Sequence, residues 1–174
     1  MKKRLIVLIS SISALLSSQT FAKADVEVTW QEPGNYWDVR PTSGSRSRFR
    51  ESTFKKLDEY IAQLAEDLPD GQTLLMTVDN LDLAGQVWPA SFVGLGNSGA
   101  EVRLIKAMDI PRMSFTYKLL DESGQVVQES AVKLKDMSFL SRSNRFFDSE
   151  TLRYEKNMIH DWFKDEFSRL MEKK

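Results

Sequence analysis

Alternation of apolar and polar residues marks several strands in this chain. Residues 26–30 (VEVTW) alternate strictly, which predicts a strand with one buried face. Residues 113–119 (MSFTYKL) alternate in the same way, and apolar positions return over 126–134 after the four residues 121–124 (DESG). Two alternating runs around a short polar segment predict an antiparallel hairpin with a tight turn.

A third apolar stretch changes phase partway along. Residues 74–78 (LLMTV) put every second side chain on one apolar face, whereas Leu81 and Leu83 continue in the opposite phase. Because side chains of a regular strand alternate strictly, the switch at Asp79 and Asn80 predicts a bulge or a break there.

Two segments carry a helical period instead. The first runs from Arg46 to Leu68 and ends before Pro69, and the second follows a predicted cap at Asp148 or Ser149. Apolar residues recur at three- and four-residue steps in both, as one buried stripe requires. The stripes comprise Phe54, Leu57, Ile61, Leu64 and Leu68 in the first helix and Leu152, Ile159, Trp162, Phe163, Phe167 and Leu170 in the second.

The segments between these elements predict the fold class. Residues 31–45 and 85–101 are rich in glycine and proline and read as long loops, the first with Tyr36 and Trp37 folded onto the core. The order is strand, helix, about four strands, helix. It predicts a single α+β domain over residues 25–174, an antiparallel sheet of about four to five strands with two amphipathic helices packed on one face as a two-layer sandwich.

The first 24 residues have the layout of a cleaved secretory signal. A basic segment at 2–4 precedes twelve apolar residues at 5–16, and Ala22 and Ala24 supply the small residues of a cleavage site. Twelve residues form about 18 Å of helix, too short for a bilayer core of ~30 Å. We expect cleavage after Ala24, with Ala22 as the alternative, and no stable membrane insertion afterwards.

Composition narrows the chemistry of the mature chain. Residues 1–24 hold four of the 24 basic residues and none of the 25 acidic ones, so residues 25–174 have a net charge of −5. This charge argues against binding nucleic acid or anionic lipid surfaces, although it leaves room for a local basic patch. The chain has no cysteine, which excludes disulfides, thiol catalysis and cysteine-based metal sites.

Residues 94–99 (GLGNSG) match the G-x-G-x-x-G pattern of dinucleotide-binding loops. Such a loop needs a buried parallel strand before it and a helix after it, because the amides at the helix start bind the pyrophosphate. Pro89 interrupts the preceding segment, and we find no βαβ pattern around the glycines. We therefore expect a glycine-rich turn that uses positive φ angles, and no cofactor.

Candidate catalytic residues are few. His160 is the only histidine, and no G-x-S-x-G motif nominates a serine for a triad with it. Carboxylates are plentiful, but no spacing singles out a pair, and Asp79, Asn80 and Asp82 lack the pattern of a calcium loop. We expect a surface histidine and solvated acids, and we assign no catalytic, metal or cofactor residue.

Two features point to binding instead. Arg46, Arg48 and Arg50 lie at the start of a helix, where positive charge opposes the helix dipole. We expect them to pair with acids such as those at 148–150, with a small anionic ligand such as a phosphate-bearing envelope molecule as the alternative. Trp88 and Phe92, followed by Leu95, would form a partner-binding patch if exposed, or close the end of the sheet if buried, which we favour.

Three long stretches resemble a known family. "LDLAGQVWPASFVGLGNSG", "VRLIKAMDIPRMSF" and "DMSFLSRSNRFFDSETLRYEKNMIHDWFKDEF" are similar to small exported proteins of Gram-negative bacteria that form a domain of unknown function. The resemblance implies a periplasmic location and brings no activity. We expect a non-enzymatic binding or envelope-accessory protein with an unknown envelope protein or small anionic ligand as partner. A hydrolase that uses carboxylates, or a serine with His160, and a structural subunit of an envelope assembly are the alternatives.

Overall fold

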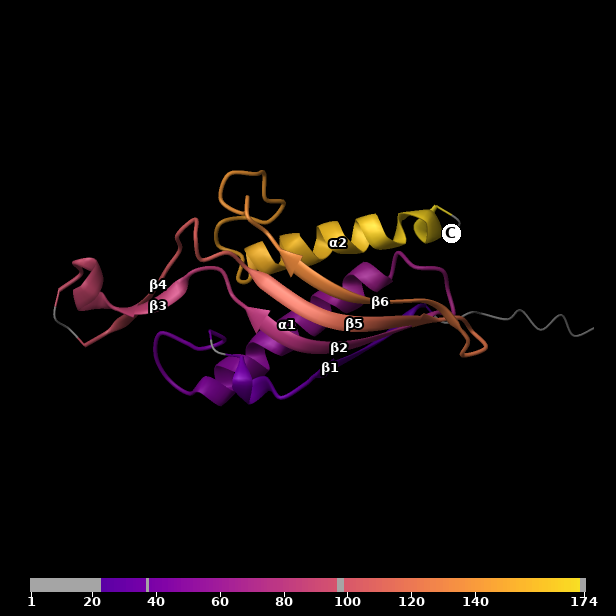
Figure 1. Cartoon of the computed structure of the whole chain (residues 1–174), viewed down its shortest axis with the longest axis horizontal. Coiled ribbons are helices and arrows are strands. Elements are labelled where there is room, and N and C mark those ends of the chain that lie inside the picture. Colours follow the sequence, from indigo (N-terminus) through magenta and orange to yellow (C-terminus); the bar gives the residue numbers. More distant parts are fainter. Residues whose placement is uncertain (1–22, 37, 97–98, 173–174) are drawn as a thin grey trace, which may run out of the picture.

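The computed structural model describes residues 23–36, 38–96 and 99–172 (Figure 1). Residues 1–22 of the predicted signal (1–24) therefore lie outside the described residues, as do Trp37 and the pair at 97–98. The elements are β1 (Asp25–Trp30), η1 (Pro33–Asn35), α1 (Arg46–Ala65), β2 (Thr73–Asp82), β3 (Gln86–Pro89), η2 (Ala90–Val93), β4 (Glu101–Leu104), β5 (Arg112–Leu120), β6 (Val126–Lys135) and α2 (Arg153–Met171).

The α+β fold expected from the sequence is confirmed. Four strands form one sheet in the order β1-β2-β5-β6, and both helices cover the same face of it. Phe54 of α1 stacks on Trp30 of β1, and Trp162 of α2 meets Phe115 of β5 edge-on. The alternate residues of β5 on the other face are exposed or half-buried, so the fold has two layers.

The sheet is mixed rather than antiparallel throughout. β1 pairs with β2 in parallel, Val28 opposite Met76, whereas β2–β5 and β5–β6 are antiparallel. The expectation of an antiparallel sheet is wrong for β1 because α1 carries the chain back along the sheet before β2 begins. Strand β1, helix α1 and strand β2 thus form a βαβ unit, although it does not contain the glycine-rich segment.

Two local predictions are confirmed in atomic detail. The register between β2 and β5 shifts between Val78 and Asn80, which places the predicted bulge at Asp79. The bulge returns Leu81 to the buried face. At the β5–β6 turn, the Asp121 carboxylate accepts hydrogen bonds from the backbone N–H groups of Ser123 and Gln125.

Residues 85–101 are not the long loop expected from their glycines and proline. β3 and β4 pair as a second antiparallel hairpin, closed by η2 and a glycine-rich segment. We call residues 86–104 the arm, because this hairpin projects well beyond the layered body (Figure 1). Its strands have only four residues each, too few for a period to show in the sequence.

The second helix starts later than its sequence suggested. α2 begins at Arg153 after Leu152, which has a positive φ of 59°, and not at Asp148 or Ser149. The acids of the expected first turn bind basic side chains instead: Asp148 pairs with Arg153, and Glu150 pairs with Lys156. These contacts hold residues 148–152 as a turn.

The topology gathers several segments at one end of the sheet. β1, β2 and β6 all run toward the end from which the arm leaves, so α1 and α2, which follow β1 and β6, both begin there (Figure 1). We call this the arm end; the 121–124 turn lies at the opposite end. No helix in the described part of the chain combines the length and apolar character needed to cross a bilayer.

Candidate functional site

Arg103 of β4 fastens the base of the arm to the body. Its guanidinium donates to the Asp38 carboxylate at 2.5 Å and to the carbonyl oxygens of Asp38, Arg40 and Gly85 at 2.9, 3.1 and 3.0 Å. The Asp38 side chain is only 8% exposed. Burial raises the pKa of Asp38, and the Arg103 guanidinium opposes that rise. One arginine thus joins three segments that are distant in sequence.

Glu155, in the first turn of α2, holds the same junction from the other side. Its carboxylate accepts a hydrogen bond of 2.7 Å from the backbone N–H of Ala84, just before the arm. The residue is buried, and this burial raises the pKa of its carboxyl group, while the bond from Ala84 and the charge of Arg103 lower it. Charged side chains therefore bind the backbone on both sides of this link: Glu155 accepts from the N–H of Ala84, and Arg103 donates to the carbonyl of Gly85.

Arg40 ties down both strands of the arm. Its guanidinium donates to the carbonyl oxygen of Val87 in β3 at 2.8 Å and to the carboxylate of Glu101 in β4 at 3.2 Å. We call Asp38, Arg40, Glu101, Arg103 and Glu155 the clamp. Because the clamp binds both strands and the link before them, it fixes the direction in which the arm projects.

Gly85 makes this close packing possible. Its φ of +76° lies in the left-handed region, and a Cβ atom there would stand 2.5 Å from Ile105 Cδ1 and 2.6 Å from the carbonyl oxygen of Leu104. A side chain of any size would push the two strands of the arm apart at their base. Glycine is therefore required at this position for the clamp to close.

The tip of the arm is apolar and faces solvent. Phe92 is 77% exposed and Leu95 is 65% exposed, so our preference for a buried, sheet-closing role is wrong for these two side chains. The reason is that the hairpin carries them away from the body (Figure 1). Trp88, nearer the body, is half-buried, and the Lys106 amine lies 4.9 Å from the centre of its ring. The tip therefore has the exposure that the alternative, a partner-binding patch, requires.

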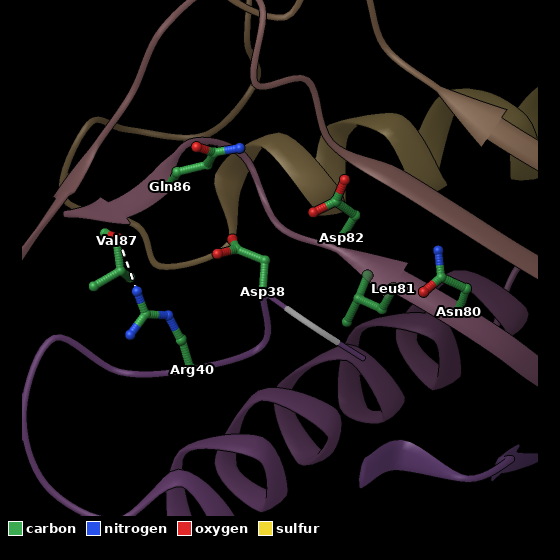
Figure 2. Close-up of a pocket in the computed structure, with 7 residues that line it drawn as sticks. All are labelled: Asp38, Arg40, Asn80, Leu81, Asp82, Gln86 and Val87. Carbon is green, nitrogen blue, oxygen red and sulfur yellow. Dashed lines mark hydrogen bonds between the residues drawn. The ribbon is translucent and has the colours of Figure 1, made fainter. Parts of the chain in front are cut away.

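Two hollows flank the clamp. The larger, of about 630 Å³, lies between the first turns of α1, the turn before α2 and the arm base, and Phe49, Leu83 and Leu152 supply apolar walls. The smaller, of about 320 Å³, is drawn in Figure 2, where Arg40 reaches the carbonyl of Val87 beside the carboxylates of Asp38 and Asp82. Asp38 and Asp82 pair with Arg103 and Arg112, so neither acid presents an uncompensated charge.

Arg46, Arg48 and Arg50 do not behave as expected. All 25 acidic residues of the chain lie in the described segments, and none of them forms an ion pair with these three arginines. The expected pairing with residues 148–150 is wrong because Asp148 and Glu150 are taken by Arg153 and Lys156. Among the described residues, Arg50 donates only to the carbonyl of Pro33, at 3.2 Å. Three cations without acid partners thus lie at the arm end.

Comparison with known families decides the classification. Residues 24–165 match the model of the family described as Protein of unknown function (DUF3016). The chain belongs to this family. The search of curated proteins found no match to this chain. The matched range includes the arm, the clamp and most of α2 of this chain.

Among the described residues, the histidine of this DUF3016 protein has no serine partner for a triad. His160 Nδ1 lies 3.6 Å from Asp161 Oδ1, and no serine among the described residues hydrogen-bonds to it. Burial and the nearby Arg145 lower the His160 pKa, which favours the neutral ring. Within residues 23–36, 38–96 and 99–172, no three His, Cys, Asp or Glu side chains are grouped so as to hold a metal ion.

The glycine-rich segment closes the arm. Gly94, Gly96 and Gly99 have φ angles of 77°, 85° and 69°, which confirms the expectation of a turn with positive φ. The preceding strand β3 belongs to an antiparallel pair rather than to a buried parallel sheet. The segment therefore lacks the strand and helix that a dinucleotide loop requires.

Two features of the sequence indicate the arm and the clamp. No residue from Leu83 to Ala100 is charged, in a chain of which 28% is Asp, Glu, Lys or Arg. Glu155 also lies three and four positions before Met158 and Ile159, on the buried stripe of α2. A carboxylate on an apolar stripe predicts a buried hydrogen bond. A long uncharged segment predicts a surface that contacts another molecule.

Proposed function

We propose that this DUF3016 protein is an exported, periplasmic binding protein that docks on a component of the cell envelope through the tip of its arm. One observation carries the proposal: a hairpin with an uncharged tip exposes Phe92 and Leu95 while its base is held by the clamp. A large apolar side chain held in water at the end of a fixed projection is typical of a contact surface.

The charges at the arm end support binding rather than catalysis. The carboxylates of Asp38, Asp82 and Glu155 all accept hydrogen bonds from within the protein. A general acid or base must instead reach a substrate atom with its proton or lone pair. The clamp therefore acts as a support, and the chemistry left for a partner is the apolar tip.

The test is binding to isolated envelope membranes. We expect the protein recovered from expressing cells to sediment with inner or outer membranes, and Phe92→Asp to remove most of this binding. Val127→Asp is the matched control, because Val127 is 48% exposed on β6 near the opposite end. Equal binding of Phe92→Asp and the native protein would overturn the proposal.

Export has its own test. We expect cell fractionation to place the protein in the periplasm, and mass spectrometry of the purified chain to find Asp25 at its N-terminus. A chain that keeps its first residues and stays with the cytoplasmic fraction would remove the periplasm from the proposal. It would leave the arm as a docking element for a partner in the cytoplasm.

A further inference from the structure

The composition of the arm changes along its length. The tip exposes Phe92 and Leu95 and carries no charge, whereas Trp88, nearer the body, lies under the Lys106 amine at 4.9 Å. A lipid bilayer has the same order of layers: the acyl region accepts Phe and Leu, and the headgroup level accommodates Trp and the amine of Lys. The polarity of the arm therefore increases from its tip toward the body, as it would in a shallow bilayer anchor.

The unpaired arginines provide a second attraction at the same end. Arg46 and Arg48 are exposed, and no Asp or Glu side chain in the described segments forms an ion pair with Arg46, Arg48 or Arg50. They begin α1, whose N-terminal dipole adds positive potential. An anionic surface that the apolar tip approaches would also attract these cations on the body behind it.

We infer that the envelope component contacted by the arm is an anionic lipid bilayer; this inference rests on the function proposed above. Shallow apolar insertion and electrostatic attraction together give peripheral binding that either alone gives only weakly. The contact is reversible and leaves the body outside the bilayer, in agreement with the expected absence of stable insertion. An uncharged protein surface would use the apolar tip only, whereas an anionic bilayer uses the arginines as well.

The net charge of the protein orients this contact. Residues 25–174 carry a net charge of −5, which disfavours most of the surface from approaching an anionic bilayer. The basic cluster is local to the arm end, so only that end is attracted. The net charge therefore limits the orientation of the contact but does not prevent it.

The decisive experiment uses protein-free vesicles. The protein recovered from expressing cells is sedimented with vesicles of phosphatidylcholine alone or mixed with phosphatidylglycerol. Every variant keeps the same N-terminus, so that segment contributes equally. We expect binding to the anionic vesicles that added salt weakens. Phe92→Asp should lower the partition coefficient by about tenfold or more, since one Phe side chain no longer enters the apolar layer. Val127→Asp should leave it unchanged.

A charge reversal tests the arginines separately. Arg46→Glu with Arg48→Glu should lower binding to the anionic vesicles by roughly fivefold or more and leave binding to phosphatidylcholine unchanged. Lys118→Glu with Arg169→Glu changes the net charge equally at exposed positions near the opposite end, late in β5 and in α2, and should have little effect. Thermal unfolding curves of all four variants should match that of the native protein, because every changed side chain is exposed.

The outcomes separate the two proposals. Binding to envelope membranes without binding to either vesicle would overturn the bilayer inference and point to a protein partner for the same arm. An equal loss from the Arg46/Arg48 and Lys118/Arg169 pairs would also overturn it, because the attraction would then be general rather than local. If Phe92→Asp changes neither measurement, the docking role of the arm fails as well.

Discussion

Two antiparallel hairpins lie in the described part of the chain, and they end in opposite ways. The β5–β6 hairpin closes through Asp121 and Glu122, and the Asp121 carboxylate binds the backbone of its own turn. Hydrogen bonds from Ser123 lower the Asp121 pKa, so the turn stays charged in water. The β3–β4 arm closes through η2 and three glycines and exposes Phe92 and Leu95.

The two hairpins are also held in different ways. The inner face of β5 is part of the main core and packs under Trp162 and Phe167 of α2. Among the described residues, none of the arm belongs to that core; charged side chains of the clamp hold it instead. The difference shows that a hairpin beyond the reach of the core can still have a fixed direction, provided that polar bonds secure its base.

The largest difference between the two regions should appear on removing one phenyl ring from each. Phe163 of α2 is 0% exposed, so Phe163→Ala should lower the free energy of unfolding by about 3–5 kcal/mol. Phe92→Ala at the arm tip should change it by less than about 0.5 kcal/mol. Urea denaturation of both variants measures the contrast, and a comparable loss from Phe92→Ala would show that the tip is packed rather than exposed.

The body of the fold was predictable because it is periodic. The alternation at 113–119 and the stripes of both helices reflect one buried face each, and the phase change at Asp79 located the bulge. Strand direction left no such trace, since inner residues of parallel and antiparallel strands alternate alike on a sheet covered on one face. The parallel pairing of β1 with β2 therefore had to come from the structure.

The clamp was not predictable because its members act across long separations. Asp38 and Arg103 are 65 residues apart, and Glu155 and Ala84 are 71 apart. No local period relates such positions. Residues Trp88 and Phe92 were identified because a glycine-rich segment with aromatic residues is conspicuous in itself, but their exposure depends on the direction of the arm, which the clamp determines.

Loss of Arg103 should be the next largest effect. Arg103→Gln leaves the buried Asp38 carboxylate without its counter-charge, and we expect about 3 kcal/mol of destabilisation. The matched control is Arg112→Gln, because the Arg112–Asp82 pair is largely exposed and should be worth less than about 1 kcal/mol. Hydrogen exchange should also show faster exchange of the β3 and β4 amides in Arg103→Gln. Equal losses of stability from both variants would mean that the Arg103–Asp38 ion pair contributes no more than a surface pair.

The glycines of the arm offer a finer comparison. Gly85→Ala adds a Cβ atom against Ile105 and the Leu104 carbonyl at a φ of +76°, and should cost about 2–3 kcal/mol. Gly94→Ala has nearly the same φ, +77°, with nothing within 4 Å, so it should cost only the backbone strain of about 1–2 kcal/mol. The difference between the two, from chemical denaturation, isolates the close packing at the arm base. No difference would show that the base is loose.

The smallest effect concerns the charge on Glu155. Burial raises the pKa of its carboxyl group, so the stabilisation from this group is complete below the pKa of the unfolded chain and is lost as the pH rises through the folded value. Glu155→Gln keeps an oxygen to accept the bond from Ala84 but cannot ionise. We expect the variant to gain about 1 kcal/mol over the native protein at neutral pH and to lose that gain on acidification.

Glu150, on the rim of the larger hollow, gives the opposite sign. Its hydrogen bond and ion pair with Lys156 lower its pKa, so its contribution is present at neutral pH and is lost as the pH falls through the folded value. The stability of Glu150→Gln relative to the native protein should therefore improve on acidification, whereas that of Glu155→Gln should worsen. Denaturation at several pH values compares the two slopes. Slopes of the same sign would mean that Glu155 is solvated, and the arm would then lack one of the bonds that fix its direction.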